Sequence, residues 1–175
     1  ARSAGGPTGF RTVGDRVHTA GGGRPQYIGR WAGRQPRPVK LAVVVQRYGA
    51  QINGGAELHA RYIAEHLANH AEVEVLTTCA RDYVSWRNEF DPGEDRVGNL
   101  LVRRFPVRHP RDPLIFGRWS HRVFEHRHSI AHELAWLESE GPTSPQLIRH
   151  LRRNASTYDF FLFFSYRYAH AYHGC

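Results

Sequence analysis

The hydrophobic residues between 40 and 79 form runs whose spacing predicts two strands joined by a helix. Lys40–Gln46 (KLAVVVQ) is a continuous β-branched run, which is typical of a strand buried on both faces of a parallel sheet. Val73–Cys79 alternates like a second strand. Between them, Ala56–Asn69 is predicted to be a helix with one apolar face, made of Leu58, Tyr62, Ile63, His66 and Leu67. This is the strand–loop–helix–strand unit of a βαβ fold.

The next segment contains a weaker pattern. Ala80–Asn99 is polar and irregular, and Asp91, Pro92 and Gly93 predict a turn within it. Leu100–Val107 (LLVRRFPV) predicts a third strand. Pro106 cannot donate to a sheet ladder, so this strand is expected to end there or to lie at a sheet edge.

Two helices and a fourth strand complete the predicted order. Apolar residues at helical spacing predict one long helix over Arg118–Glu140, and Ser144 with Pro145 opens a short helix that runs to about Arg153. Asp159–Ser165 (DFFLFFS) is the predicted fourth strand. The order β-α-β-β-α-α-β favours an α/β fold with a Rossmann-like, doubly wound parallel sheet.

The net charge first suggests a polyanion as partner. The chain has 24 basic and 16 acidic side chains, a net charge of +8 and a pI near 10.1, which is typical of nucleic-acid or membrane-surface binding. However, residues 1–38 hold seven arginines and one acid, Asp15, and therefore carry +6 of that charge. The remaining +2 makes residues 39–175 nearly neutral, so we expect no nucleic-acid partner for the folded part.

The composition divides the chain into a leader and a domain. Residues 1–38 contain nine glycines and four prolines and too little apolar surface to order themselves, so a disordered leader or linker is predicted. Residues 39–175 are the predicted domain. There is no methionine in the chain, and the apolar run 160–164 is followed by no closing element before Cys175. We therefore expect a truncated domain, the fragment of a longer protein.

The loop after the first predicted strand is the first candidate site. In open α/β sheets, ligands bind beyond the carboxyl ends of the strands. Asn53, Gly54, Gly55 and Glu57 lie there, and glycines before a helix start suit a phosphate or a sugar. The loop matches neither G-x-G-x-x-G nor G-x-x-x-x-G-K-[ST], which disfavours dinucleotide and P-loop binding. A loop whose glycines only make a turn is the alternative.

Histidines and arginines offer further candidates. His66 with His70, and His128 with His132, have the i,i+4 spacing of metal ligands, but no third ligand stands in a recognisable pattern, so no metal is expected. The arginines between 103 and 127 could face acidic lipid headgroups or a phosphorylated acceptor, although a solvated surface is the stronger interpretation. Two cysteines cannot form a disulfide framework, and a reducing compartment is the default.

The segment after the fourth predicted strand should face the same cleft as the glycine loop. It reads YRYAHAYHG and offers Tyr166, Tyr168 and His173 for stacking and hydrogen bonding, and His170 for proton transfer. Arg47, which follows the first strand, is a further candidate for acceptor binding. A helix that merely packs against another part of the protein is the competing interpretation.

Several of these segments resemble one family when taken in order. KLAVVVQRYGAQINGGAELHARYIAEHLA resembles the opening of a bacterial family 4 glycosyltransferase of the GT-B fold. TTCARDYVSWRNEFDPGED, VRRFPV, WLESEGPTSPQLIRHL and YDFFLFFSYRYAHAYHG resemble its continuation in one subgroup. The resemblance covers residues 39–174 and excludes the leader.

The resemblance implies two Rossmann-like domains around a cleft, of which this chain would supply the N-terminal, acceptor-side half. It implies sugar transfer from a nucleotide-sugar to a glycan or lipid-linked acceptor in polysaccharide synthesis, with retention and without a required metal or other cofactor. It places Gly54 and Gly55, with Glu57 beside them, near the donor phosphates and the acceptor, and it makes His170 the nearest candidate for the cleft histidine. The donor-binding residues belong to a C-terminal domain that this chain does not include.

Two other classes of function stay open from the sequence. One is a basic nucleic-acid-binding module, and the other is a small Rossmann-type oxidoreductase. Neither a secretory signal nor a membrane-spanning run is visible, so we expect a cytoplasmic protein that could touch the inner face of the membrane.

Overall fold

The computed structural model describes residues 37–175, so all but the last two residues of the predicted leader lie outside the described part. The strands are β1 Lys40–Val44, β2 Glu72–Thr78, β3 Gly93–Val97, β4 Leu100–Phe105 and β5 Phe160–Phe163. The helices are α1 Gly55–Leu67, α2 Pro113–Glu125, α3 Ile130–Glu140, α4 Pro145–Arg153 and α5 Ala169–Gly174, with a short 3₁₀ turn at Ala155–Thr157.

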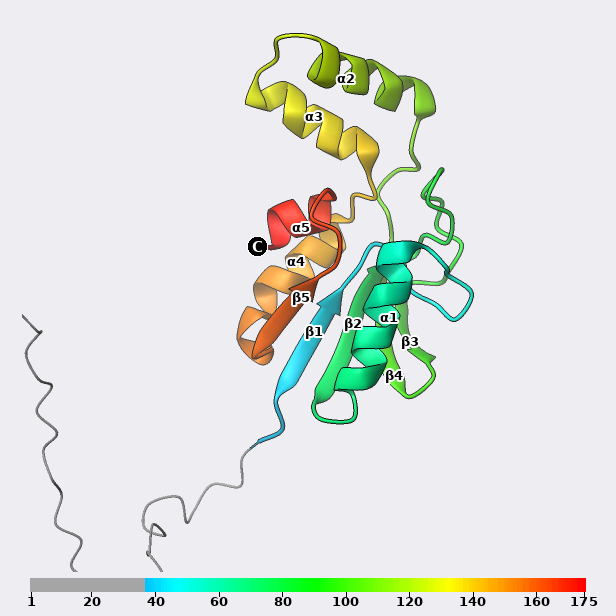
Figure 1. Ribbon diagram of the computed structural model, residues 1–175, viewed down its shortest axis with the longest axis vertical. Helices are drawn as coiled ribbons and strands as arrows, with labels where there is room; N and C mark the ends of the chain where they lie inside the picture. Colours follow the sequence, from blue (N-terminus) through cyan, green and yellow to red (C-terminus); the bar gives the residue numbers. More distant parts are fainter. Residues whose placement is uncertain (1–36) are drawn as a thin grey trace, which may run out of the picture. The chain divides into compact units, whose positions relative to one another are not determined.

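The five strands form one sheet in the order β3-β4-β2-β1-β5 (Figure 1). β1 pairs in parallel with both β2 and β5, and β2 pairs in parallel with β4, whereas β3 is antiparallel to β4. Val43 lies at the centre, opposite Val75 on one side and Leu162 on the other. The predicted α/β, Rossmann-like fold is therefore confirmed, with a mixed and mostly parallel sheet.

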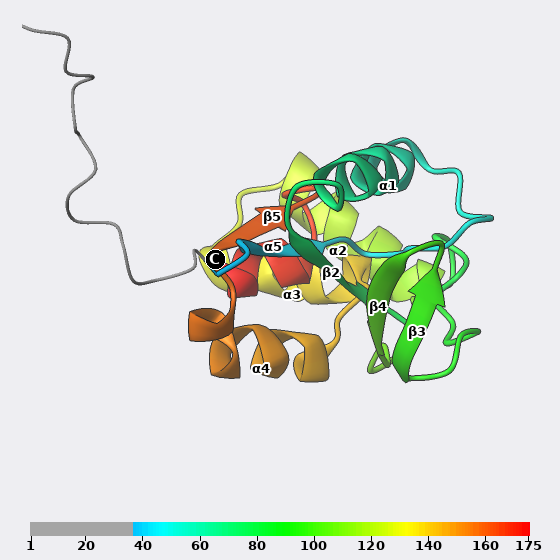
Figure 2. The same cartoon turned by 90° about the horizontal axis from the view of Figure 1, so that it is seen from below.

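Helices cover both faces of the sheet, so the central strands are buried on both sides. Figure 2 shows α1 on one face and α4 on the other. One core lies under α1, and the second lies under α4, where Leu147 and Leu151 meet Ala42 and Val44. This double burial explains why β1 has a continuous run of apolar residues.

The buried face of α1 differs from the predicted one. Its buried residues are Glu57, Ala60 and Ala64, whereas Tyr62 is 58% exposed. The small alanine side chains allow the helix to pack closely against the β-branched residues of β1 and β2. Of the predicted face, Leu67 packs partly against this core, whereas Tyr62 and His66 are exposed, so a search that follows large side chains finds only part of the buried stripe.

β3 was not predicted, because its sequence GEDRV is polar and four of its five residues are exposed. Ion pairs hold it against β4, between Arg104 and Asp95 at 2.9 Å and between Arg103 and Glu94 at 2.9 Å. Charged side chains on an outer strand are a common protection against edge-to-edge pairing. β4 ends at Phe105, directly before Pro106 as predicted, and it is an inner strand because β3 covers it.

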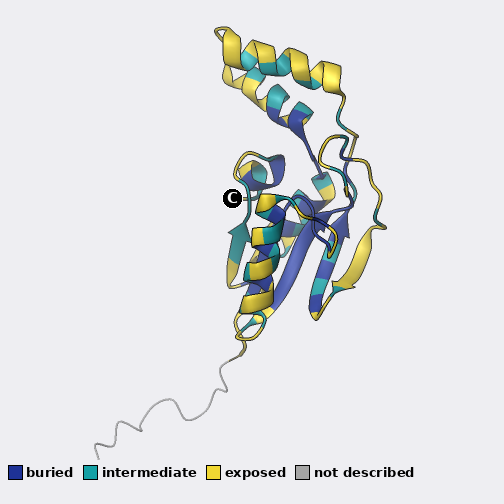
Figure 3. Ribbon diagram, turned by 45° about the vertical axis from the view of Figure 1, so that its right-hand side comes forward, coloured by how far each residue is buried: buried dark blue, intermediate teal, exposed yellow. Residues whose placement is uncertain are grey.

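The single long helix predicted over Arg118–Glu140 is wrong: the segment contains parts of two helices that form a hairpin. Asp112 caps α2 by accepting hydrogen bonds from the backbone N–H groups of Leu114 and Ile115, and Ser129 opens α3. The apolar spacing continues across the break because the two helices face each other, with Trp119 against His132. Figure 3 shows much of this hairpin exposed. No helix of residues 37–175 is long and apolar enough to cross a bilayer.

Candidate functional site at the carboxyl ends of the strands

The strand order reverses between β1 and β5. From β1 the chain passes to β2 on one side, and it returns later to β5 on the other side of β1. The segment after β1 leads into α1 on one face, and the segment after β5 leads into α5, which packs beside α4 on the opposite face (Figure 1). Ligands of open α/β sheets bind at such a reversal, beyond the carboxyl ends of the strands.

The glycine loop leaves open space on the β1 side of this reversal. Gly54 is the residue before α1, and its carbonyl oxygen accepts the first helical hydrogen bond from the N–H of Leu58 at 2.8 Å. A Cβ atom at Gly55 would have no neighbour within 4 Å, and Asn53 is exposed. The helix start is therefore accessible, and its first N–H groups have no partner inside the helix. Ligand binding at this loop stays a prediction.

Arg47 and Glu57 form a buried ion pair beneath the loop. They are 9% and 5% exposed, and the Nε of Arg47 donates to Oε1 of Glu57 at 2.7 Å. The same guanidinium donates to the carbonyl oxygen of Arg81 at 2.9 Å and lies over the ring of Tyr83. The sequence predicted both Arg47 and Glu57 as ligand-binding residues; in the structure their charges neutralise each other and fix the loop.

Tyr168 lies on the β5 side and packs edge-on against Trp86, with ring centroids 5.7 Å apart. Burial raises the pKa of the Tyr168 hydroxyl. Trp86 in turn donates from Nε1 to the carbonyl oxygen of Glu140 at 2.8 Å, and Arg111 donates to the same oxygen. The carboxylate of Glu140 is 2.7 Å from Arg167. Trp86 and Glu140 thus join the segment after β5 to the base of the α2–α3 hairpin.

The other predicted residues of this segment separate in space. Tyr166 is 93% exposed and borders an apolar hollow beside Phe124, while His173 faces a hollow next to α4. His170 is buried, and neither ring nitrogen has a hydrogen-bond partner within the described residues. Its burial lowers its pKa to about 4, so the ring is neutral at pH 7. In this structure His170 has no access to solvent.

Two residues at this edge have unusual backbone conformations. Trp86 has φ 55° and Ser165 has φ 70°, and they are the non-glycine residues with positive φ in the described part of the chain. Such conformations cost about 1–3 kcal/mol each and are concentrated at functional sites. Ser165 lies two residues after the end of β5, so this conformation occurs close to the reversal.

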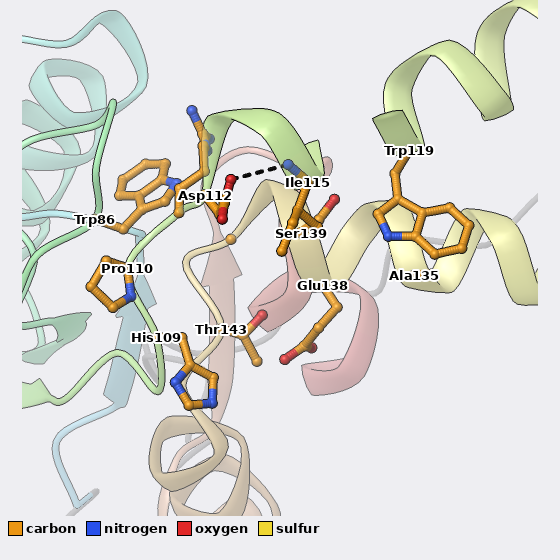
Figure 4. A pocket seen from close by; sticks show the side chains of 12 residues that line it. Trp86, His109, Pro110, Asp112, Ile115, Trp119, Ala135, Glu138, Ser139 and Thr143 are labelled. Atoms are coloured by element: carbon orange, nitrogen blue, oxygen red, sulfur yellow. Dashed lines mark hydrogen bonds between the residues drawn. The ribbon is translucent and has the colours of Figure 1, made fainter. Parts of the chain in front are cut away.

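A hollow with a volume of about 470 Å³ opens beside Trp86, and we call it the aromatic hollow (Figure 4). Its walls come from the loop after β4, from α2 and α3, and from the turn that precedes α4. Trp119 and Ile115 supply apolar surface, while His109, Glu138 and Thr143 supply polar groups. Pockets that bind small molecules have this character, mostly apolar with a few placed polar groups.

The basic stretch predicted between Arg103 and Arg127 divides into two groups. Arg103, Arg104 and Arg111 each form an ion pair with a carboxylate, at Glu74 or Glu94, Asp95 and Glu140 respectively. Among residues 37–175, no carboxylate pairs with the others, which are Arg108, Arg118, Arg122 and Arg127. The first group is structural and the second is free to meet a ligand.

Sequence reasoning missed Trp86 and Glu140, and it treated Arg111 only as surface charge. A tryptophan inside the polar segment Ala80–Asn99 was the available signal, because such a large apolar ring is rarely left in solvent. Within the described residues, no group of three or more histidine, cysteine, aspartate or glutamate side chains is arranged to hold a metal ion.

The chain was compared with protein-family models, curated proteins and solved structures, and none of them matches it.

Proposed function

We propose that this chain is the acceptor-side half of a glycosyltransferase, which moves a sugar from a nucleotide-sugar to a glycan or lipid-linked acceptor. In this proposal a second α/β half of GT-B type binds the nucleotide-sugar, no metal takes part, and transfer proceeds with retention. The observation that carries the proposal is the reversal between β1 and β5, where the open helix start at Gly55 and the aromatic segment that contains Ser165 and Tyr168 follow neighbouring parallel strands at the same edge of the sheet.

The geometry supports a binding role more than a chemical one. Arg47 and Glu57 are occupied with each other, and His170 is buried and neutral. The accessible groups are the N–H groups at the start of α1 and the mixed surface of the aromatic hollow. These groups can position a polar ring and a phosphate oxygen, which is what an acceptor-side domain contributes to catalysis.

In the proposed enzyme, the groups that stabilise the leaving diphosphate belong to the second half. Residues 1–175 alone are therefore expected to turn over no nucleotide-sugar, because electrostatic stabilisation of that charge is the largest part of such catalysis. Turnover by residues 1–175 alone would contradict this division of labour. An adjoining second α/β half with two glutamates eight residues apart would support it.

Position 55 gives a direct test in an enzyme that holds both halves. The Cβ atom of Gly55→Trp would meet no atom within 4 Å, and its indole ring would occupy the open space at the carboxyl end of β1. We expect transfer to fall by more than about 100-fold, which corresponds to about 2.7 kcal/mol. The matched control is Glu65→Trp, which places the same ring on an exposed position of α1. Equal activity of the two variants would reject the cleft assignment.

A further inference from the structure

A second hollow adjoins the aromatic one, and we call it the basic hollow. It has a volume of about 560 Å³ and lies between the start of α4, the loop after β4 and α5. Glu138 and Thr143 border both hollows, so the two adjoin, and we refer to them together as the groove. The cationic side chains of the basic hollow are Arg108, Arg149, Arg152, Arg153 and His173.

Within the described part of the chain, these arginines have no partner of opposite charge. None of the carboxylates in residues 37–175 forms an ion pair with them, and Glu138 is the one acidic residue that borders this hollow. α4 buries Leu147 and Leu151 against the sheet, which turns Arg149 and Arg152 outward together. Like charges three positions apart on a helix repel each other. A bound anion would remove that repulsion, and the guanidinium fork matches the geometry of phosphate oxygens.

Thr143 supplies an independent sign of a ligand at the junction. The residue is 9% exposed, and its Oγ1 has no hydrogen-bond partner within the described residues. Figure 4 shows its side chain between those of His109 and Glu138. A buried hydroxyl without a hydrogen-bond partner is energetically unfavourable. Thr143 borders the groove, so a rotation of its side chain that turned the hydroxyl toward the groove would let a ligand oxygen satisfy it.

The lining of the aromatic hollow indicates the chemical class of the molecule that would carry the anionic group. Its indole and aliphatic surfaces, with Glu138 and His109 at the rim, suit a ring that has apolar faces and hydroxyl edges. The arginines line the adjoining basic hollow, next to the place that this ring would occupy. We propose that the groove binds a phosphorylated saccharide, with the sugar ring beside Trp119 and the phosphate among Arg108, Arg149 and Arg152.

The assignment of this ligand as the acceptor rests on the proposed function, whereas the binding itself does not. If an enzyme that contains both halves transfers no sugar, the proposed function is rejected, but binding of the phosphorylated saccharide at the groove is not. Absence of binding at the groove would reject the present inference even if transfer were observed. The two results are measured separately.

Isothermal titration calorimetry of the full 175-residue chain tests the inference, with glucose 6-phosphate, glucose, inorganic phosphate and uridine diphosphate glucose as probes. We expect glucose 6-phosphate to bind at least about tenfold more tightly than glucose or phosphate alone. Arg149→Ala/Arg152→Ala should remove that advantage and leave glucose binding unchanged. The control variant Arg87→Ala/Arg96→Ala removes two exposed arginines outside the groove and should change neither affinity.

Two further variants separate binding from folding. Thr143→Val removes an unpaired buried hydroxyl at constant volume, so thermal stability should stay the same or rise while glucose 6-phosphate affinity falls. Trp119→Phe should weaken glucose 6-phosphate and not phosphate. The inference is overturned if phosphate alone binds as tightly as glucose 6-phosphate, if the control variant loses as much affinity as Arg149→Ala/Arg152→Ala, or if uridine diphosphate glucose is the tightest probe.

Discussion

Gly54 and Glu57 are so close that a side chain at position 54 would overlap the carboxylate of Glu57. That carboxylate cannot move freely, because it is buried and paired with Arg47. Gly54→Ala should therefore disturb the ion pair and lower the free energy of unfolding by about 1–3 kcal/mol, as overpacking does in cores. Urea unfolding followed by circular dichroism measures the change.

Gly55→Ala is the matched control for this substitution. A Cβ atom at position 55 has no neighbour within 4 Å, and the residue is the first of α1. Alanine is favoured over glycine in helices by up to about 1 kcal/mol, so stability should be unchanged or higher. Equal losses at positions 54 and 55 would show that the Glu57 contact is not the reason for the glycine.

The ion pair itself can be tested by a double-mutant cycle. Glu57→Gln leaves the Arg47 charge buried without its partner and should cost about 3–5 kcal/mol, and Arg47→Met should cost a similar amount. The double variant should lose much less than the sum of the two, because no unpaired charge remains. Additive losses in thermal and urea unfolding would indicate that the two side chains are not coupled.

The strands that the sequence reveals are those buried on both faces. β1 and β2 have β-branched interiors, and the pairing Ser144–Pro145 was enough to predict the start of α4. β3 has no such pattern because it is held by charges at the sheet edge. The start of α2 carries the same kind of signal, an Asp112 cap before Pro113, but the apolar spacing that continues into α3 concealed the break.

The sequence also predicted part of the candidate site, because the site lies at the ends of the strands that the sequence pattern locates. Sequence position relative to a strand end indicates which residues reach the carboxyl edge, and Tyr168 and the glycine loop do lie there. It cannot indicate which charges are already neutralised, so Arg47 and Glu57 were indistinguishable from free ligands. Burial of His170 depends on α5 packing beside α4, which no local pattern records.

Nucleic-acid binding, if observed, should come from the basic leader. Residues 1–38 carry +6 of the +8 net charge. Deletion of residues 1–36 retains Arg37, which donates to Asp159 at 3.1 Å, and should abolish salt-dependent binding of a labelled oligonucleotide in fluorescence anisotropy. The full chain at the same salt concentration is the reference. If the shortened chain keeps the affinity and the salt slope, the folded part is itself a nucleic-acid-binding module.

Because the His170 ring is buried, we expect the free energy of unfolding to fall in mild acid. Its pKa in the folded chain is about 4, below the ordinary 6.5, because burial disfavours the charged ring. As pH falls below about 6.5, the unfolded chain gains a proton that the folded chain does not bind until pH about 4. The free energy of unfolding is therefore highest above this window and should decrease through it, by up to about 3 kcal/mol.

Urea unfolding at a series of pH values measures this slope. His170→Phe should flatten it between pH about 6.5 and about 4, because the substituted ring has no proton to bind. Some slope should remain, since burial also lowers the pKa of His150. His66→Ala, which removes an exposed histidine from α1, is the control and should keep the wild-type slope. A wild-type slope in His170→Phe would mean that the ring is solvated and protonates in the folded chain.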